Sequence, residues 1–439
     1  MNMRPLVAML VLASGLFSAN ASATLFNADG IQLPYQQNAE LSRDAASARV
    51  ADANGDGRMD VMLLMFARAP VEGRSLDPQF WLYEQQPDGS MQVARQFSGM
   101  FEGGEYEPES LGFGDLDGDG IAEMVLKRPN DKMAILVRTP SGPYREVAQF
   151  DYPLKGRGLV QTEIRDLNGD GFADVLLRVK GLGVAIFRGR GTLTLDAPVY
   201  RPMYSLDSFE LADADGDGRL DMLGTEMGSS NVGVALANPA TGLFGQPWTA
   251  YTPGYWQWPY AITSGVFGGV RSLVVAEYSQ IQTGPNTVDI GFLFRFLHPG
   301  PDGRYVTHDS FRIPVGGTAN FYVIKAADLD GDGDDDLMMN LASMPHIFLQ
   351  EDGRLQPPQI LRYAAYGNRQ PQPGNVHLAD FNGDGCLDIG YAYRAYTIHY
   401  RTDCPTRNPN APISLQSQKV KANVVRGRMK RARAWWRFW

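Results

Sequence analysis

A nine-residue string that recurs along the chain constrains this sequence more than any other feature. The string reads Asp, any residue, Asp or Asn, Gly, Asp, Gly, two further residues, then Asp or Glu. Successive copies start 63, 51, 47, 115 and 52 residues apart, so one interval is about twice as long as the others. Self-similarity at a period of about fifty residues predicts an array of equal structural units. The copies are 52–60, 115–123, 166–174, 213–221, 328–336 and 380–388.

A seventh unit is expected in the middle of the long interval. Residues 264–275 have the apolar runs and the Gly-Gly pair of a strand–turn–strand unit but none of the acids. Short glycine turns, from Asp29-Gly30 to Asp352-Gly353, form a second marker that alternates with the seven unit positions. The spacing leaves room for four strands per unit. The sequence therefore predicts an all-β fold, a seven-bladed β-propeller of four-stranded antiparallel blades.

The order of the two markers predicts how the ring closes. The chain begins with a glycine turn and an apolar segment, 31–35, and it ends with the last acidic string and two strands, 389–394 and 396–401. The last unit thus lacks an outer strand, and the first unit has one to spare. We expect the N-terminal strand to close the ring on the edge of the seventh blade, which removes an open sheet edge.

The two cysteines, Cys386 and Cys404, are expected to form a disulfide. If the last two strands pair about residues 394–396, the cysteines lie opposite each other on neighbouring antiparallel strands. That separation suits a disulfide. Two free thiols are the alternative.

The two ends of the chain have compositions of their own. Arg4, the apolar run 6–17 and the small residues Ala21-Ser22-Ala23 predict a signal peptide over 1–23. We therefore expect a secreted, periplasmic or cell-surface protein with the propeller at 24–404. A polar linker, 405–418, would lead to a basic aromatic tail, 419–439.

Charge is distributed unevenly along the chain. The net charge is −9, but the tail holds eight Lys and Arg residues and no acid, and Arg4 lies in the predicted signal peptide, so residues 24–418 carry −18. An acidic body argues against a nucleic-acid partner and for cation binding. The tail suits contact with an anionic membrane surface, or it folds back on the acidic body.

The spacing of the acids predicts calcium sites. Calcium takes six to eight oxygen ligands. Side chains at positions 1, 3, 5 and 9 and the carbonyl at position 7 can supply them, while glycine allows the sharp turn. Without a cation, two carboxylates about 4 Å apart repel each other by roughly 4 kcal/mol at an effective dielectric constant near 20. We expect about six Ca²⁺ ions; the alternative is a set of metal-free Asn/Asp/Gly turns. The candidate ligands are Asp52, Asn54, Asp56, Arg58 and Asp60; Asp115, Asp117, Asp119, Ile121 and Glu123; Asp166, Asn168, Asp170, Phe172 and Asp174; Asp213, Asp215, Asp217, Arg219 and Asp221; Asp328, Asp330, Asp332, Asp334 and Asp336; and Asp380, Asn382, Asp384, Cys386 and Asp388.

These strings resemble the FG-GAP/VCBS repeats of bacterial exported proteins and the calcium loops of integrin α-subunit propellers. The resemblance covers nearly all of residues 24–403. It implies calcium between the first two strands of each blade and ligand binding on the opposite face of the ring. Glu123 departs from the final Asp of the pattern but can still coordinate. The fifth unit has no acids, so we expect no metal there.

The family resemblance implies adhesion, glycan or protein binding, or a role beside a catalytic domain. Residues 251–260 are rich in aromatic side chains, which can stack on sugars or anchor a protein partner. Alternatively they fill the wedge between blades. The candidate ligand-binding residues are Tyr255, Trp256, Trp258 and Tyr260.

Catalysis has little support in the sequence. The five histidines show no metal-ligand spacing, and no serine elbow, phosphate loop or zinc motif is present. The sequence favours a recognition or adhesion module. The alternatives are a lyase-like polysaccharide enzyme on a calcium propeller and a structural scaffold of the cell envelope. A Lys, Arg or His that converges with acids on the face away from the calcium loops would favour the enzyme.

Overall fold

The computed structural model describes most of the propeller region. The predicted signal peptide, linker and tail lie outside the described residues, as do Tyr255 and Trp256. The described residues contain no helix that could cross a membrane. They are 25–33, 43–67, 79–98, 100–101, 104–105, 107–140, 142–152, 159–179, 182–203, 208–226, 230–238, 241, 243–254, 257–284, 287–300, 304–314, 321–341, 344–362, 376–393 and 395–404.

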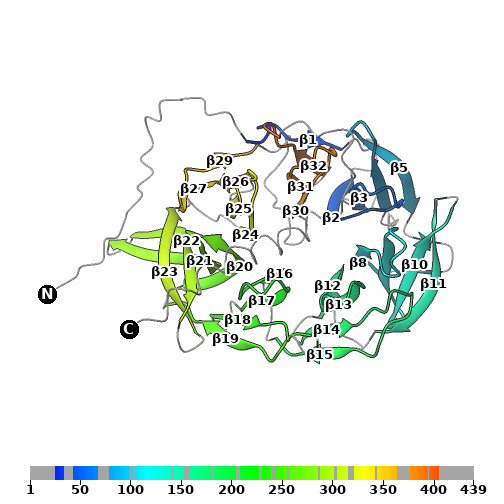
Figure 1. Cartoon of the computed structure of the whole chain (residues 1–439), viewed down its shortest axis with the longest axis horizontal. Coiled ribbons are helices and arrows are strands. Elements are labelled where there is room, and N and C mark those ends of the chain that lie inside the picture. Colours follow the sequence, from blue (N-terminus) through cyan, green and yellow to red (C-terminus); the bar gives the residue numbers. More distant parts are fainter. Residues whose placement is uncertain are drawn as a thin grey trace, which may run out of the picture.

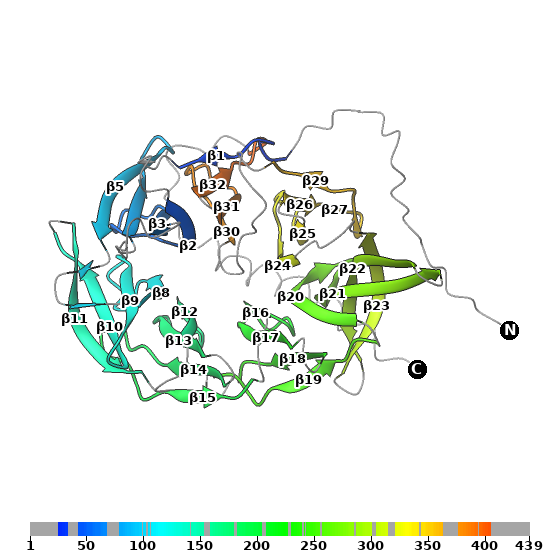
Figure 2. The same cartoon turned by 180° about the vertical axis from the view of Figure 1, so that it is seen from behind.

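Seven four-stranded antiparallel sheets form a ring, so the predicted seven-bladed propeller is confirmed (Figure 1). Each sheet is a blade whose first strand lies near the axis of the ring and whose fourth strand lies on the perimeter. The first strands of all blades therefore surround the centre in both views (Figure 2).

Blades 1 to 4 follow the chain in order. Blade 1 contains β2 (Arg43–Ala51), β3 (Asp60–Ala67), β4 (Gln79–Gln85) and β5 (Met91–Ser98). Blade 2 contains β8 (Glu107–Gly114), β9 (Glu123–Arg128), β10 (Lys132–Arg138) and β11 (Tyr144–Asp151). Blade 3 contains β12 (Leu159–Arg165), β13 (Asp174–Val179), β14 (Gly183–Phe187) and β15 (Val199–Arg201). Blade 4 contains β16 (Ser208–Ala212), β17 (Asp221–Glu226), β18 (Asn231–Ala235) and β19 (Trp248–Tyr251).

Blades 5 to 7 complete the ring. Blade 5 contains β20 (Gln257–Phe267), β21 (Val270–Gly284), β22 (Thr287–Pro299) and β23 (Tyr305–Pro314). Blade 6 contains β24 (Phe321–Ala327), β25 (Asp336–Leu341), β26 (Met344–Phe348) and β29 (Gln359–Ile360). Blade 7 contains β30 (Val376–Ala379), β31 (Asp388–Tyr393), β32 (Ala395–His399) and β1 (Ile31–Gln32). Two short ribbons pair β6 (Met100–Phe101) with β7 (Gly104–Glu105) and β27 (Gln350–Glu351) with β28 (Arg354–Leu355).

Burial follows from the position of each strand in its blade. The second strands are apolar and buried on both faces because a blade packs between two neighbours; β25, for example, is buried throughout. The outer strand β11 instead alternates buried and exposed residues, as a one-sided strand should. The hydrophobic clusters join adjacent blades. One of them packs Met62 and Phe80 of blade 1 against Leu111 and Met124 of blade 2.

The N-terminal segment closes the ring as predicted. Ile31 of β1 pairs with Ile398 of β32, and the Leu33 N–H donates to the Tyr396 carbonyl at 2.8 Å. Leu33 also joins Trp81 of blade 1 in one hydrophobic cluster, so this segment seals the junction between the last and first blades.

The disulfide between Cys386 and Cys404 is confirmed, with a Cα–Cα distance of 6.0 Å. The pairing that suggested it was wrong by one residue. Tyr393 pairs with Ala395, so the hairpin is centred on residue 394, and the cysteines are not opposed in the ladder. Cys386 instead lies in the last acidic string, and Cys404 follows β32. The bond therefore ties that string to the end of the propeller.

Blade 5 differs from its neighbours in two ways. Its strands have 11, 15, 13 and 10 residues, whereas those of blade 4 have 5, 6, 5 and 4. Its first hairpin turns through Gly268 and Gly269 alone, with φ of 58° and 78°, in a left-handed conformation that glycine adopts at little cost. The acid-free fifth unit is thus a tight hairpin on an enlarged blade.

Candidate metal centres

Each acidic string connects the first and second strands of its blade. We call the strings loops 1, 2, 3, 4, 6 and 7, after their blades. All blades have the same strand order, so the loops lie on one face of the ring, which we call the loop face. In every loop the glycines at positions 4 and 6 have positive φ, as Gly118 (82°) and Gly120 (88°) of loop 2 illustrate. The backbone can therefore curl tightly around a central point.

The carboxylate at position 1 organises this curl. In loop 2, Asp115 accepts the Gly118 N–H at 2.7 Å on Oδ1 and the Gly120 N–H at 3.0 Å on Oδ2. The first bond recurs in all six loops, at 2.6–2.8 Å. An acid that accepts several backbone N–H groups is held in one orientation before any ion arrives.

The side chains at positions 3 and 5 make the same kind of bond, each with the backbone N–H two residues later. The oxygen at position 3 accepts the N–H of position 5 at 2.8–3.3 Å. The carboxylate at position 5 accepts the N–H of position 7 at 2.8–2.9 Å. Asn54, Asn168 and Asn382 use the amide oxygen in the same way that Asp uses a carboxylate oxygen at this position.

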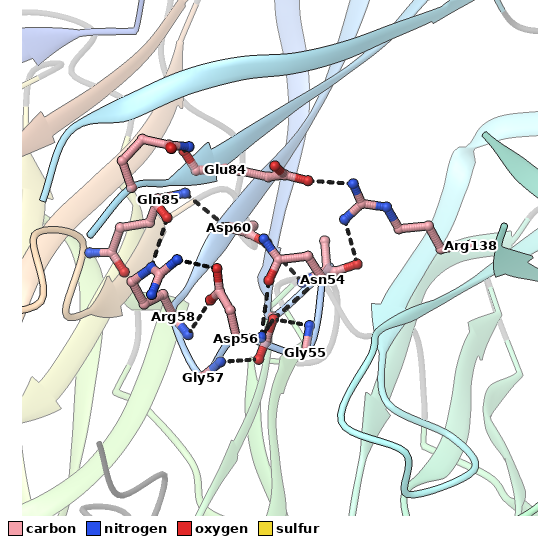
Figure 3. A network of polar contacts seen from close by, with 12 residues as sticks. Asn54, Gly55, Asp56, Gly57, Arg58, Asp60, Glu84, Gln85 and Arg138 are labelled. Carbon is pink, nitrogen blue, oxygen red and sulfur yellow. Dashed lines mark hydrogen bonds and ion pairs between the residues drawn. The ribbon is translucent and has the colours of Figure 1, made fainter. Parts of the chain in front are cut away.

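The acid at position 9 is the first residue of the second strand and is at most 2% exposed in every loop. In loop 1, Asp60 accepts the Ala53 N–H at 2.9 Å and the Gln85 N–H, from the end of β4, at 2.9 Å. It therefore links the loop to the third strand of the blade (Figure 3).

Burial is the main cause that raises the pKa of each position-9 acid, and the charges of the neighbouring acids raise it further. The hydrogen bonds from backbone N–H groups lower the pKa and offset part of this rise. The pKa values are about 6 for Asp174 and Asp221, about 7 for Asp60, Asp336 and Asp388, and about 8 for Glu123. In the protein alone, ionisation of these acids is therefore less favourable than for an ordinary carboxyl, and a bound cation would favour it.

Acidic oxygens converge within 4.8 Å of one another in three loops. The groups are Asp115, Asp117 and Glu123; Asp213, Asp215 and Asp221; and Asp328, Asp330 and Asp332. The other three loops carry Asn at position 3 and so have one acid fewer in the same place. The donor set contains only oxygen, as a hard divalent cation requires, and it fits calcium. The assignment of individual ligands stays a prediction.

Side chains from neighbouring strands and blades surround the loops, and sequence reasoning missed them. At loop 1, Arg58 pairs with Asp56 and donates from Nε to the Gln85 carbonyl at 2.9 Å. Arg138 of blade 2 donates to the Ala53 carbonyl at 2.8 Å and pairs with Glu84 (Figure 3). Arg138 lies far from the loop in sequence, so no local signal marks it.

Blade 5 closes its hairpin with side chains from blade 6. The Val266 N–H donates to Asp335 Oδ2 at 2.7 Å, and the Gly268 N–H donates to Gln350 Oε1 at 2.8 Å. Gln350 returns a bond from Nε2 to the Val266 carbonyl at 3.1 Å. Asp335 occupies position 8 of loop 6 and Gln350 lies in β27, so loop 6 supplies part of the clasp for the hairpin that lacks a loop. The expectation that blade 5 holds no metal stays a prediction.

The predicted aromatic residues within the described chain lie at the start of β20, away from the loop face. Trp258 and Tyr260 pack on Tyr278 of β21, with ring centroids 5.8 and 6.0 Å apart. These three rings are half-buried, and Tyr260 and Tyr278 also contact the buried Phe292. We call Trp258, Tyr260 and Tyr278 the blade 5 aromatic group. Tyr278 was not predicted, because only strand pairing brings it to Trp258.

Charged side chains recur on the innermost strands, three residues before the first acid of a loop. Lys325 of blade 6 lies 2.5 Å from Glu210 of blade 4. Burial, with Arg49 and Lys325 nearby, lowers the pKa of His377 to about 3. Burial lowers the pKa of Arg49, and the negative charge of Glu163 offsets part of this shift. The members of this inner belt are Arg49, Glu163, Glu210, Lys325 and His377.

Comparison with known proteins identifies the repeats. Residues 166–224 and 328–391 match the model of the FG-GAP-like repeat. The chain is thus a seven-bladed β-propeller that contains FG-GAP-like repeats. No curated protein matches the chain.

Several solved structures have a similar fold at low identity. The rhamnogalacturonan lyase PL11 of Bacillus licheniformis is 14% identical, with 86% of this chain and 76% of that chain covered and a TM-score of 0.49. The rhamnogalacturonan lyase YesW is 14% identical, with 87% and 75% covered and a TM-score of 0.49. The WD40 domain of Toxoplasma gondii coronin is 10% identical, with 87% and 91% covered and a TM-score of 0.48. Likenesses this distant say nothing about what the present chain binds. The propeller and the disulfide are compatible with an extracellular protein.

Proposed function

We propose that this protein is an exported, calcium-stabilised recognition module that binds glycans through the blade 5 aromatic group. Calcium at the six acidic loops would stiffen the loop face, and the ligand would dock on the opposite face. A protein ligand at the same group is the alternative. The possible membrane contact of the basic tail, 419–439, remains a separate expectation that concerns residues outside the described chain.

Calcium is supported by the way each loop is built before any ion binds. Backbone N–H groups fix one side of the carboxylates, and the acids at position 9 are buried with raised pKa values. Such acids are stabilised in their ionised form by a cation, so metal binding would be linked to folding.

The observation that carries the ligand-binding proposal is the exposure of the blade 5 aromatic group. Trp258, Tyr260 and Tyr278 are each half-buried, although the buried Phe292 beneath them shows that this blade can cover a ring completely. Gln280 Nε2 donates to the Tyr278 hydroxyl at 3.3 Å and adds a polar edge. Flat rings with a few fixed polar groups suit the apolar faces and hydroxyls of a sugar.

A glycan array and pull-down assays on the full chain would test this proposal. We expect Trp258→Ala and Tyr278→Ala to weaken binding at least about tenfold, a loss typical of a central aromatic contact. Tyr200→Ala is a matched control, because Tyr200 is an aromatic residue 47% exposed on blade 3. Equal binding by all three variants would assign the blade 5 aromatic group to packing.

The inner belt favours a second candidate, a polysaccharide-cleaving enzyme. It brings Lys, Arg and His side chains together with two glutamates, although three residues from the loops and not on the opposite face, where such a group would favour an enzyme most. However, Lys325 and Glu210 already neutralise each other, and Arg49 donates to the Leu111 and Ala48 carbonyls. An assay for new chain ends in anionic polysaccharides, with Lys325→Met as the comparison, decides between the candidates. Cleavage by the parent chain that the variant lacks would favour the enzyme.

A further inference from the structure

The space beside the position-4 glycine is filled differently from loop to loop. Ile121 of blade 2 packs beside Gly55 of loop 1, and Gln85 of blade 1 lies beside Gly383 of loop 7. At loops 2 and 3, a Cβ added to the glycine at this position would meet nothing within 4 Å. At loops 4 and 6 an arginine from the following blade stands there. The loops are therefore not electrostatically equal, although their strings look alike.

The arginine at loop 4 is Arg271, from the second strand of blade 5. Its guanidinium lies beside Gly216, and one terminal nitrogen is 3.5 Å from Oδ2 of Asp213, the acid at position 1. The Arg271 side chain is 28% exposed and the Asp213 side chain 19%, so water screens this pair only in part. Arg401 at loop 6 differs, because it donates to the Asp330 carbonyl and pairs with Asp403.

Blade 5 also holds loop 4 by neutral bonds. Ser264 Oγ donates to the Asp213 carbonyl at 2.8 Å, and the Tyr305 hydroxyl donates to the Ala214 carbonyl at 3.3 Å. Loop 4 is thus fixed against the blade that has no acidic loop, and Arg271 is fixed against loop 4. The packing of blade 5 against blade 4 therefore sets the position of the Arg271 guanidinium.

We propose that Arg271 acts as a built-in counter-ion that makes loop 4 a weaker calcium site than loop 2 and holds the junction of blades 4 and 5 when calcium is scarce. The inference rests on the proposed calcium binding and deepens it. Loops 2 and 4 both carry acids at positions 1, 3, 5 and 9, but position 7 is Ile121 in loop 2 and Arg219, which pairs with Asp217, in loop 4. The Arg271 substitutions therefore carry the test of this inference. A positive charge beside the acid at position 1 repels an incoming divalent ion and offsets the repulsion among the acids when no ion is bound.

Calcium titration calorimetry on the full chain assigns the two sites. Glu123→Gln should remove a tight binding step, and Asp221→Asn should remove a weak one, since each replaces the buried position-9 acid of its loop. Arg271→Met should tighten the weak step by about tenfold, as expected for removal of one nearby, partly screened charge. Arg271→Lys should keep the wild-type affinity.

A second readout separates this role from simple packing. Arg271→Met should lower the melting temperature in chelator and restore it in saturating calcium, because the ion replaces the lost charge. The control is Arg312→Met, in the same blade, where Arg312 pairs with Asp289 at 2.6 Å and, like Arg271, has a buried Nε without a hydrogen-bond partner. That variant should melt lower by the same amount in both conditions and leave every calcium step unchanged.

These experiments distinguish failure of the inference about Arg271 from failure of the proposed calcium binding. A wild-type chain that binds no calcium would overturn both proposals. Calcium binding in which Asp221→Asn removes a step as tight as the step lost in Glu123→Gln would overturn this inference alone. An unchanged weak step in Arg271→Met would also overturn it. Because Arg219 also pairs with an acid of loop 4, the decision rests on the Arg271 variants, and Arg271→Gln repeats the test with a polar neutral side chain if Arg271→Met does not fold.

Discussion

The first hairpins of blades 5 and 6 occupy equivalent places in the ring but are closed by different means. In blade 6, loop 6 carries six acids between β24 and β25. In blade 5, Gly268 and Gly269 complete the turn, and the side chains of Asp335 and Gln350 hold it from outside. The fold thus tolerates a hairpin that closes with uncharged backbone groups and a hairpin that concentrates negative charge.

The difference shows where each blade obtains its stability. Blade 5 has long strands and a core of stacked aromatic rings, such as Phe294 and Phe311 with centroids 4.9 Å apart. We therefore expect its hairpin to need no ion. Blade 6 has a second strand of six residues and buries Asp336 completely at the end of its loop. We expect the loop-bearing blades to depend on calcium and blade 5 to be independent of it.

Removal of calcium should give the largest effect. Six ions bound only by the folded chain, each well above its dissociation constant, stabilise it by roughly 2.7 kcal/mol per site at a hundredfold excess. Chelation should therefore lower the melting temperature by at least about 10 °C. Scanning calorimetry in calcium, in magnesium and in chelator measures this, and an unchanged midpoint would remove the proposed distinction between the blades.

The pH dependence of stability should be present without calcium and nearly absent with it. Without calcium, the raised pKa values of Asp336 (about 7) and Glu123 (about 8) mean that the folded chain binds more protons than the unfolded chain between about pH 4 and 8. Stability should then fall as pH rises through this window, by several degrees in melting temperature. In saturating calcium the folded acids are held ionised and the unfolded acids are ionised above about pH 5, so stability should be nearly constant over most of this window and fall only at lower pH, where the unfolded carboxyls take up protons. Melts at pH 5.5 and 8 in both conditions provide the check.

Loss of one acid at position 9 should have a smaller effect, confined to one loop. Asp336→Asn keeps the shape but removes the charge and sets an amide against the Leu329 and Gln350 N–H groups, which now donate at 2.8 Å. We expect the loss of one calcium ion and about 3 kcal/mol of unfolding free energy in saturating calcium. Asp309→Asn, at an exposed position on β23, should change neither quantity. Denaturant unfolding and calcium stoichiometry are the measurements.

The smallest effect should come from the clasp on blade 5. Gln350→Met preserves the size of a side chain in a residue that is 1% exposed but removes its bonds to Gly268 and Val266. The unfolding free energy should fall by about 1–2 kcal/mol. The decrease should be equal with and without calcium. A loss that appears only in chelator would show that the blade 5 hairpin also depends on the ion.

The sequence was informative wherever the repeat itself carried the signal. The regular spacing of the strings predicted seven blades, and the leftover segment at 31–35 predicted the closing strand that Ile31 forms with Ile398. The acid-free fifth unit was identified by its Gly-Gly turn. Each of these features depends on a local sequence pattern or on the number of units, and both can be read directly from the sequence.

Contacts between side chains of different blades could not be predicted from the sequence in the same way. Arg271, Arg138 and Tyr278 act at places set by the packing of neighbouring blades or by pairing across long strands. The register of the last hairpin was also predicted one residue away from its observed centre, because a turn of one residue more or less leaves the composition of the strands unchanged. The charges around each acidic loop therefore depend on which blades are neighbours in the ring, and the repeat sequence alone does not specify them.

Closure of the ring by its own first strand affects how the molecule is made. β1 can pair with β32 only after the last blade has been synthesised, because more than 360 residues separate Ile31 from Ile398. Joining such distant segments is slow, since the entropy of closing a long loop is lost before the contacts form. Until then the last hairpin presents an unpaired edge, so nascent or truncated chains should be the forms most prone to assemble with one another.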